Sequence, residues 1–256
     1  MKRNISLLGL VAIVLALSSS AFADNILVQN FPWGSNAVNE ARMTDVFGAG
    51  NFTAYDFVGA IPGTIFSGTN AFVFLEGGDG SDVEWDAYIG ANSAAILAWV
   101  TAGGRLLLQS ASYFEGRGNT TLGPGTITGG EADLSDCGTL TAAGTAAFTF
   151  GGGTAAFQCG NYLSHDYITG SGLTVYMNSD AGNPNVAGTA YGSGYIMYSG
   201  LTFSDWHDDG PSLENNVICT AAGAGCGAAV PEPASLSLLG TGLLGLATVL
   251  LRKRRA

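Results

Sequence analysis

Apolar runs beside clustered basic residues occupy both ends of the 256-residue chain and leave one long middle segment to fold as a domain. At the N-terminus, Lys2 and Arg3 precede an apolar run that ends in the small-x-small sequence Ala21-Phe22-Ala23. This order is typical of a secretory signal peptide that is cleaved before Asp24. An uncleaved membrane anchor is the alternative, but it needs about 20 apolar residues. We therefore expect residues 1–23 to be removed by signal peptidase.

The C-terminal end carries three features in a fixed order. Pro231-Glu232-Pro233 comes first, a glycine-containing apolar run follows at 236–251, and the chain closes on Arg252-Lys253-Arg254-Arg255. The run is just long enough to enter a bilayer as a helix, and the positive-inside rule would hold the basic cluster in the cytoplasm. We therefore expect a transmembrane helix at 236–251, preceded by an Ala/Gly linker at 221–230.

These three features together resemble the PEP-CTERM sorting signal over residues 231–256. The resemblance implies recognition by an exosortase, a membrane transpeptidase or protease of Gram-negative bacteria that make exopolysaccharide. It further implies cleavage near Pro-Glu-Pro, transient residence in the inner membrane and a final location at the cell surface or in the extracellular matrix. Retention as a single-span anchor is the alternative.

The middle segment is strongly acidic. Residues 24–230 contain only Arg42, Arg105 and Arg117 as basic residues against 19 acidic ones, a net charge of −16. Such a surface repels phosphate backbones, which excludes nucleic-acid binding. An apolar content of 47% excludes wholesale disorder. The remaining partner classes are neutral exopolysaccharides, cations and basic proteins.

Four cysteines, Cys137, Cys159, Cys219 and Cys226, all lie in this segment. An even number of cysteines in an exported chain predicts disulfides. Pairing of neighbours, Cys137 with Cys159 and Cys219 with Cys226, closes the shortest loops and is the pairing we expect. A zinc site is the alternative, but no two cysteines have Cys-x-x-Cys spacing and neither histidine is near a pair.

Apolar runs alternate with helical patterns along residues 24–220. We expect strands at 25–31, 52–58, 70–75, 105–110, 173–177 and 195–201, and helices at 35–47, 81–102 and 211–222. Strands that alternate with helices predict βαβ units and a mostly parallel sheet. Residues 113–160 are rich in Gly and Thr, and there we expect an inserted β segment.

Three short pieces of this segment resemble the class I glutamine amidotransferase-like fold, especially its trehalose-utilisation-type branch. They are WVTAGGRLLLQSAS at 99–112, HDYITGSGL at 165–173 and YGSGYIMY at 191–198. The resemblance implies a flavodoxin-like, three-layer α/β/α domain over residues 24–220. The glutaminases of this class use a cysteine on a tight Gly-x-Cys-x-Gly turn, where this chain has Gln109-Ser110-Ala111-Ser112. The resemblance therefore predicts the fold and argues against the activity.

A serine triad can still be assembled from Ser110 or Ser112, His165, and Asp166 or Asp205. Its chemistry requires the imidazole within about 3 Å of the hydroxyl and an acid that orients the imidazole. A carbohydrate-active or other hydrolase is therefore our alternative function.

Two acidic clusters are candidate metal sites. Asp79, Asp82 and Glu84 offer the oxygen ligands that calcium prefers, but they lack the EF-hand order. An acidic first turn stabilised by the helix dipole is the competing interpretation. The second cluster spans residues 205–209.

Aromatic residues follow three of the expected strands: Trp33, Tyr113 and Trp206. In parallel sheets, binding sites form beyond the carboxyl ends of the strands. Flat rings beside carboxylates stack on and hydrogen-bond sugars, although buried core aromatics are the competing interpretation. We expect an exported, exosortase-processed surface or matrix protein with a non-enzymatic structural or binding role.

Overall fold

The computed structural model describes residues 24–32, 35–112, 118–130, 132–203, 210–223 and 226. The expected signal peptide at 1–23 and the expected transmembrane helix at 236–251 both lie outside these residues. Among the described residues, no helix combines the length and the apolar character needed to cross a membrane.

Five parallel strands form one half of a nine-stranded main sheet. Their order is β2 (Phe52–Tyr55), β1 (Asp24–Val28), β3 (Asn70–Glu76), β4 (Arg105–Gln109) and β12 (Gly194–Ser199). The inner strands are continuous apolar runs because helices or strands cover both of their faces. Six predicted strands are confirmed in position, five in this half and one in the other half.

The other half of the main sheet is antiparallel. It continues from β12 through β11 (Pro184–Tyr191), β10 (Thr174–Ser179), β7 (Ser135–Leu140) and β8 (Phe157–Ser164). The sheet is therefore mixed. Only two residues join β11 to β12, and so short a connection makes a hairpin, because a parallel crossover needs a dozen residues or more.

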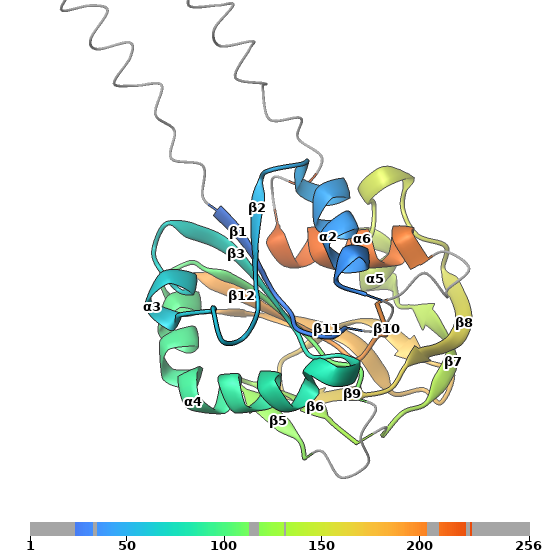
Figure 1. Cartoon of the computed structure of the whole chain (residues 1–256). Coiled ribbons are helices and arrows are strands. Elements are labelled where there is room, and N and C mark those ends of the chain that lie inside the picture. The colour runs from blue at the N-terminus through green and yellow to red at the C-terminus, as the bar shows by residue number, and fades with distance from the viewer. Residues whose placement is uncertain are drawn as a thin grey trace, which may run out of the picture. The chain divides into compact units, whose positions relative to one another are not determined.

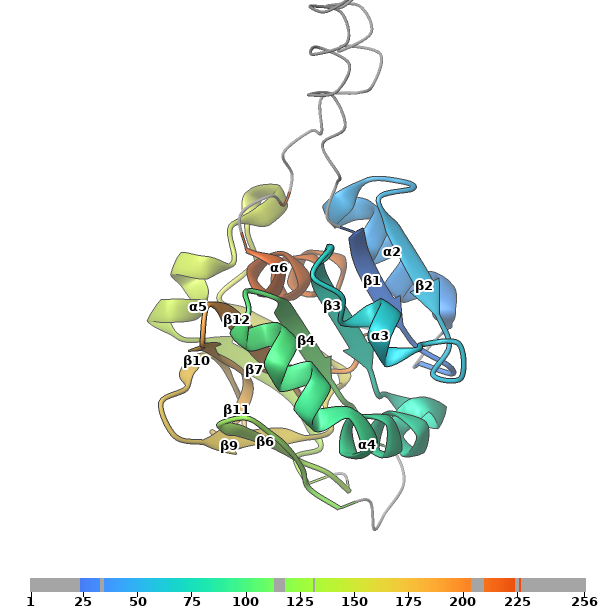
Figure 2. The ribbon, with the colours of Figure 1, turned by 90° about the vertical axis from the view of Figure 1, so that its left-hand side faces the viewer.

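Helices pack on both faces of the main sheet (Figures 1 and 2). One face carries α2 (Asn36–Phe47), α5 (Ala142–Ala147), α6 (Gly210–Ala222) and the short turn η2 (Phe150–Gly152). The other carries α3 (Pro62–Ile65) and α4 (Asp82–Thr101), the latter preceded by the turn η1 (Asp79–Ser81). The three predicted helices correspond to α2, α4 and α6.

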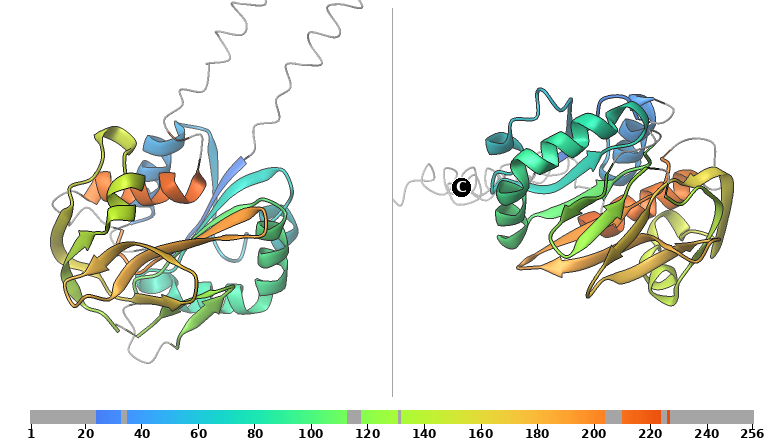
Figure 3. Two further views of the ribbon diagram at one scale, coloured as in Figure 1. Left: turned by 180° about the vertical axis from the view of Figure 1, so that it is seen from behind. Right: turned by 90° about the horizontal axis from the view of Figure 1, so that it is seen from below.

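A small antiparallel sheet lies on the same face as α4. Its order is β5 (Thr120–Leu122), β6 (Gly125–Thr128) and β9 (Tyr167–Gly170), and its Leu122, Ile127 and Ile168 join the core beneath α4. Residues 113–160 were expected to form one insertion, but the structure divides them. The β5–β6 hairpin joins the small sheet, whereas β7 and β8 extend the main sheet (Figure 3).

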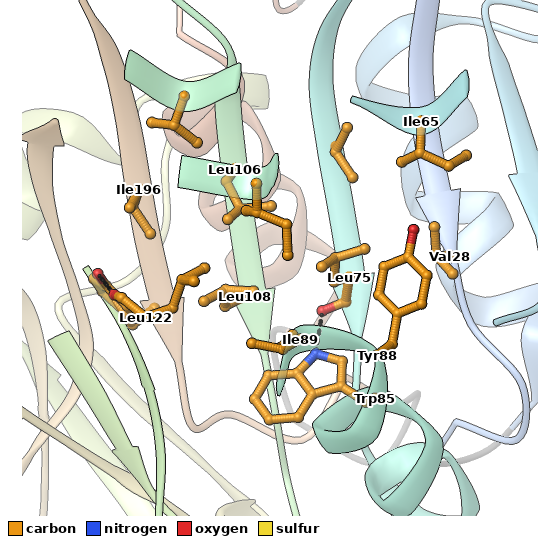
Figure 4. Close-up of a cluster of buried hydrophobic side chains, with 14 of the residues drawn as sticks. Val28, Ile65, Leu75, Trp85, Tyr88, Ile89, Leu106, Leu108, Leu122 and Ile196 are labelled. Atoms are coloured by element: carbon orange, nitrogen blue, oxygen red, sulfur yellow. Dashed lines mark hydrogen bonds between the residues drawn. The ribbon is translucent and has the colours of Figure 1, made fainter. Parts of the chain in front are cut away.

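Trp85 of α4 anchors the core on this face (Figure 4). Its side chain is fully buried, and its indole Nε1–H donates to the carbonyl of Leu75 over 3.1 Å. A Cβ at Gly77 would lie 2.6 Å from the indole ring, so the chain after β3 passes directly under it. The start of α4 is therefore fixed against the carboxyl end of β3.

Candidate functional site

A polar residue lies at the carboxyl end of each of four neighbouring parallel strands. Glu76, Gln109 and Ser199 are aligned across β3, β4 and β12, and Gln29 follows directly after β1. All four are at most 3% exposed. Glu76 Oε1 accepts from the Gly78 amide at 2.6 Å, and Gln109 Nε2 donates to the Leu201 carbonyl at 2.6 Å. This row holds in place the loops that leave the carboxyl edge of the sheet.

Two serines beyond β4 converge on one carboxylate. The hydroxyl of Ser110 donates to Asp166 Oδ2 over 2.8 Å, and the hydroxyl of Ser112 donates to Asp166 Oδ1 over 2.7 Å. The Ser112 amide also donates to Asp166 Oδ2, over 3.1 Å. Both serines and Asp166 are fully buried. We call Ser110, Ser112, His165 and Asp166 the carboxyl-edge cluster.

The end of β12 places Asp166 in this cluster. The amides of His165 and Asp166 both donate to the Gly200 carbonyl, at 3.0 and 3.4 Å. A Cβ at Gly200 would overlap the backbone carbonyl of Asp166. A glycine is therefore required here, because any side chain would push Asp166 away from the serines.

His165 contacts the cluster through the backbone instead of the hydroxyls. Its Nδ1 is 3.2 Å from the Ser112 carbonyl oxygen, which makes Nδ1 the protonated nitrogen in this contact. Its ring lies against that of Tyr162, with centroids 5.6 Å apart. His165 is 3% exposed, whereas Tyr162 is 52% exposed.

The structure therefore brings Ser112, His165 and Asp166 together in an order that differs from a catalytic triad. In a triad the imidazole accepts the serine proton and the acid binds the imidazole. Here the carboxylate of Asp166 accepts a hydrogen bond directly from the Ser112 hydroxyl, and the Ser112 oxygen accepts one from the Gly130 amide at 2.9 Å. The hydroxyl is thus engaged both as donor and as acceptor.

The contacts of Gly130 and Gly200 in this cluster were not predicted, and Ser110 was predicted as a candidate nucleophile but not as a direct hydrogen-bond donor to Asp166. The sequence does mark Ser110 and the polar strand ends Gln29, Glu76, Gln109 and Ser199, because in each case a polar residue ends or directly follows an apolar run. No local signal connected Ser110 to Asp166, since 56 residues separate them.

Two of the candidate calcium ligands, Asp82 and Glu84, differ in exposure. Asp82 is fully buried at the start of α4, whereas Glu84, two residues further on, is exposed. The side chain of Asp79 lies outside the described part. Among the described residues, no group of three or more His, Cys, Asp or Glu side chains is positioned to hold a metal ion. Both acidic residues occupy the first turn of α4, where the helix dipole favours negative charge.

The aromatic candidates Trp33, Tyr113 and Trp206 lie outside the described residues, as does the second acidic cluster at 205–209. The described chain reaches Pro32 after β1, Ser112 after β4 and Phe203 after β12. These three described ends follow β1, β4 and β12 of the parallel half, in which β3 separates β1 from β4.

One predicted disulfide is confirmed, and the second pair is present as thiols. Cys137 and Cys159 face each other on β7 and β8 and are joined by a disulfide. Cys219 and Cys226 are two separate thiols in the structure, and the expected bond between them stays a prediction. Cys226 Sγ nevertheless lies 3.1 Å from the carbonyl oxygen of Cys219.

Solved structures with a similar arrangement have low sequence identity to this chain. A putative GMP synthase component from Thermoplasma acidophilum is 9% identical with a TM-score of 0.49, over 78% of this chain and 94% of that one. A cytoplasmic protein from Salmonella typhimurium is 10% identical with a TM-score of 0.49, over 76% and 97%.

A β-galactosidase from Rahnella sp. R3 is 14% identical with a TM-score of 0.45, over 78% of this chain. The match spans 30% of the β-galactosidase chain.

No curated protein matches the chain. A protein-family model does match residues 229–255, and it describes the PEP-CTERM protein-sorting motif. This match includes Pro231-Glu232-Pro233 and the basic cluster as far as Arg255. The chain therefore carries a C-terminal PEP-CTERM motif, which implies an exported protein that is processed by an exosortase and sorted to the cell surface.

Proposed function

We propose that this chain is a surface or exopolysaccharide-matrix protein of a Gram-negative bacterium. Signal peptidase removes residues 1–23, residues 236–251 hold the chain in the inner membrane for a time, and an exosortase cleaves near Pro231-Glu232-Pro233. The PEP-CTERM match at 229–255 is the observation that carries this proposal. The acidic character of residues 24–230 is consistent with a soluble extracellular domain.

The role we propose for the described domain is structural or binding, without catalysis. Its parallel half has the strand order 2-1-3-4-5 of flavodoxin-like sheets, with β12 as the fifth strand. By the resemblance to amidotransferases, the Gln109–Ser112 segment stands where those enzymes carry their cysteine, and it contains no cysteine. Asp166 holds both serine hydroxyls, which supports a role for the cluster in fixing loops.

The ligand class we propose is a neutral glycan bound at the carboxyl edge. In the sequence, Trp33, Tyr113 and Trp206 follow β1, β4 and β12, whose carboxyl ends lie at this edge, and aromatic rings stack on sugars. An anionic polymer is disfavoured, because a domain of charge −16 repels it unless a divalent cation bridges the two.

Binding to purified neutral polysaccharides tests the ligand class. The exported domain should be retained on such a polysaccharide, and Trp33→Ala and Trp206→Ala should each weaken retention at least tenfold. Tyr162→Ala is the matched control, since Tyr162 is an exposed aromatic on the edge strand β8. Equal loss in all three variants, or no retention of the wild type, would contradict glycan binding at this edge.

Hydrolysis at the carboxyl-edge cluster is the second candidate function. The observation in its favour is the convergence of Ser112, His165 and Asp166 at the edge where parallel sheets hold their sites. Purified protein should then turn over an aryl ester or aryl glycoside, and both Ser112→Ala and His165→Ala should abolish turnover. Turnover that survives both substitutions would eliminate this site as its source.

A further inference from the structure

The last turn of α6 is fixed by Arg105 and Gly223. The Arg105 guanidinium donates to the carbonyls of Ala221 and Thr220, at 2.7 and 3.2 Å. Gly223 adopts a left-handed conformation with φ of +81°, and its amide donates to the Cys219 carbonyl over 2.9 Å. This geometry ends the helix and reverses the chain direction.

The reversal brings Cys226 back onto the helix that it follows. Its thiol lies 3.1 Å from the Cys219 carbonyl oxygen and 3.5 Å from that of Gly223, and it is hydrogen-bonded to the Cys219 thiol. Both cysteines are partly buried and pack against the core on the α2 and α6 face. The contact between them depends on the turn, because residue 226 could not otherwise reach residue 219.

The two thiols differ in acidity. The hydrogen bond from Cys226 lowers the pKa of Cys219, and the same bond, together with burial, raises the pKa of Cys226. Cys219 is therefore the thiol that ionises first and attacks an external disulfide.

We propose that Cys219 and Cys226 form a disulfide in the exported protein, and that this bond fixes the residue from which the sorting segment leaves the domain. The Cys219 thiolate attacks the disulfide of an exported thiol oxidase and releases one of its thiols. The Cys226 thiolate then displaces the second thiol. Two protein thiols lose two electrons and two protons, and one external disulfide is reduced to two thiols.

The bond shortens the free connection to the sorting motif. From Ala222, the last residue of α6, nine residue steps lead to Pro231, a maximal extended span of about 31 Å. From Cys226, five steps remain, a span of about 17 Å. The second part of this inference rests on the proposed function, because it concerns the distance between the domain and the exosortase motif. The Cys137–Cys159 bond has no such effect, since it joins two strands within the sheet.

Differential alkylation of the full chain from exporting cells tests the bond itself. Free thiols are blocked with iodoacetamide under denaturing conditions, then disulfides are reduced and labelled with N-ethylmaleimide. Cys219 and Cys226 should carry N-ethylmaleimide to the same extent as Cys137 and Cys159, which report that the compartment is oxidising. The proposal would be overturned if Cys219 and Cys226 carried iodoacetamide in a sample in which Cys137 and Cys159 carried N-ethylmaleimide.

Elastase digestion of the same protein tests the connection. Cys226→Ser should raise the rate of cleavage within residues 221–226 at least tenfold, with an unchanged circular dichroism spectrum. A four-residue insertion between Gly227 and Ala228 is the matched control, because it lengthens the segment and leaves both cysteines in place. It should leave this rate unchanged, whereas equal rates in wild type and Cys226→Ser would overturn the proposed restraint.

If the chain is not an exosortase substrate, the outcome is distinguishable from a missing disulfide. The chain would then keep its C-terminal residues in a host that has an exosortase, while the alkylation and elastase results at Cys219 and Cys226 would be unchanged.

Discussion

At the scale of single residues, Asp166 determines the carboxyl-edge cluster, because it accepts three hydrogen bonds from two serines. Asp166→Asn replaces one acceptor oxygen with a donor, which leaves a buried hydroxyl or amide without its partner. We expect a loss of about 2–3 kcal/mol in the free energy of unfolding. Asp136→Asn is the control, since this exposed carboxylate accepts one amide hydrogen bond from Tyr162. Equal urea midpoints for the two variants would contradict the role of Asp166.

Tyr88 should make the free energy of unfolding fall as the pH becomes alkaline. Burial raises the pKa of Tyr88 to about 12, and its hydroxyl donates to the Ala60 carbonyl over 2.8 Å. The unfolded chain ionises this group near pH 10, so its contribution is complete below pH 10 and is lost as the pH rises to about 12.

Urea unfolding between pH 8 and pH 12 measures this contribution. Tyr88→Phe should flatten the decline above pH 10 and cost about 1 kcal/mol at pH 8, where the hydrogen bond is lost. Part of the decline should remain, because burial also raises the pKa of Tyr195 and Tyr198. A pH profile that is the same for wild type and Tyr88→Phe would refute the assignment.

Individual site residues could be named from the sequence, but their contacts could not. Ser112, His165 and Asp166 were candidates because their chemistry is recognisable. The direct serine–carboxylate contact depends on Gly200, whose missing side chain admits the backbone of Asp166. Such a close approach involves residues that are distant in sequence, and no local pattern encodes it.

At the scale of secondary-structure elements, a glycine just after a helix and a glycine inside a helix should respond oppositely to substitution by alanine. Gly223 has φ of +81°, and a Cβ there would lie 2.7 Å from the Arg105 guanidinium carbon. Gly223→Ala should therefore destabilise the domain by about 1–3 kcal/mol. Gly90 lies inside α4 and faces open space, so Gly90→Ala should stabilise by about 0.5–1 kcal/mol. Thermal unfolding measures both, and the same sign for both would contradict this account.

The parallel half of the sheet was predictable because its strands are continuous apolar runs between helices with clear periodicity. Most of the antiparallel half could not be predicted from the sequence. β7, β8 and β11 contain Gly, Thr, Asn and Gln, and their pairing comes from hairpins and from the Cys137–Cys159 bond. β-propensity depends on cross-strand neighbours, which the local sequence does not specify.

At the scale of the whole molecule, the charge of −16 on residues 24–230 should make stability depend on salt. Like charges repel most at low ionic strength, where the Debye length is long. We expect the melting temperature to rise by roughly 2–5 °C between 10 and 150 mM NaCl. MgCl₂ at equal ionic strength should raise it at least as much. A melting temperature that is constant or falls with salt would show that the acidic surface carries no net repulsion.

The exported, exosortase-processed nature of the chain is the central claim, and the masses of its termini test it most directly. The protein is isolated from cells with and without an exosortase, and its intact mass and terminal peptides are measured. With the exosortase, the chain should begin at Asp24 and end near Pro231-Glu232-Pro233. Without it, the chain should retain Arg252 to Arg255. A chain that keeps these basic residues in both cell types would contradict the account.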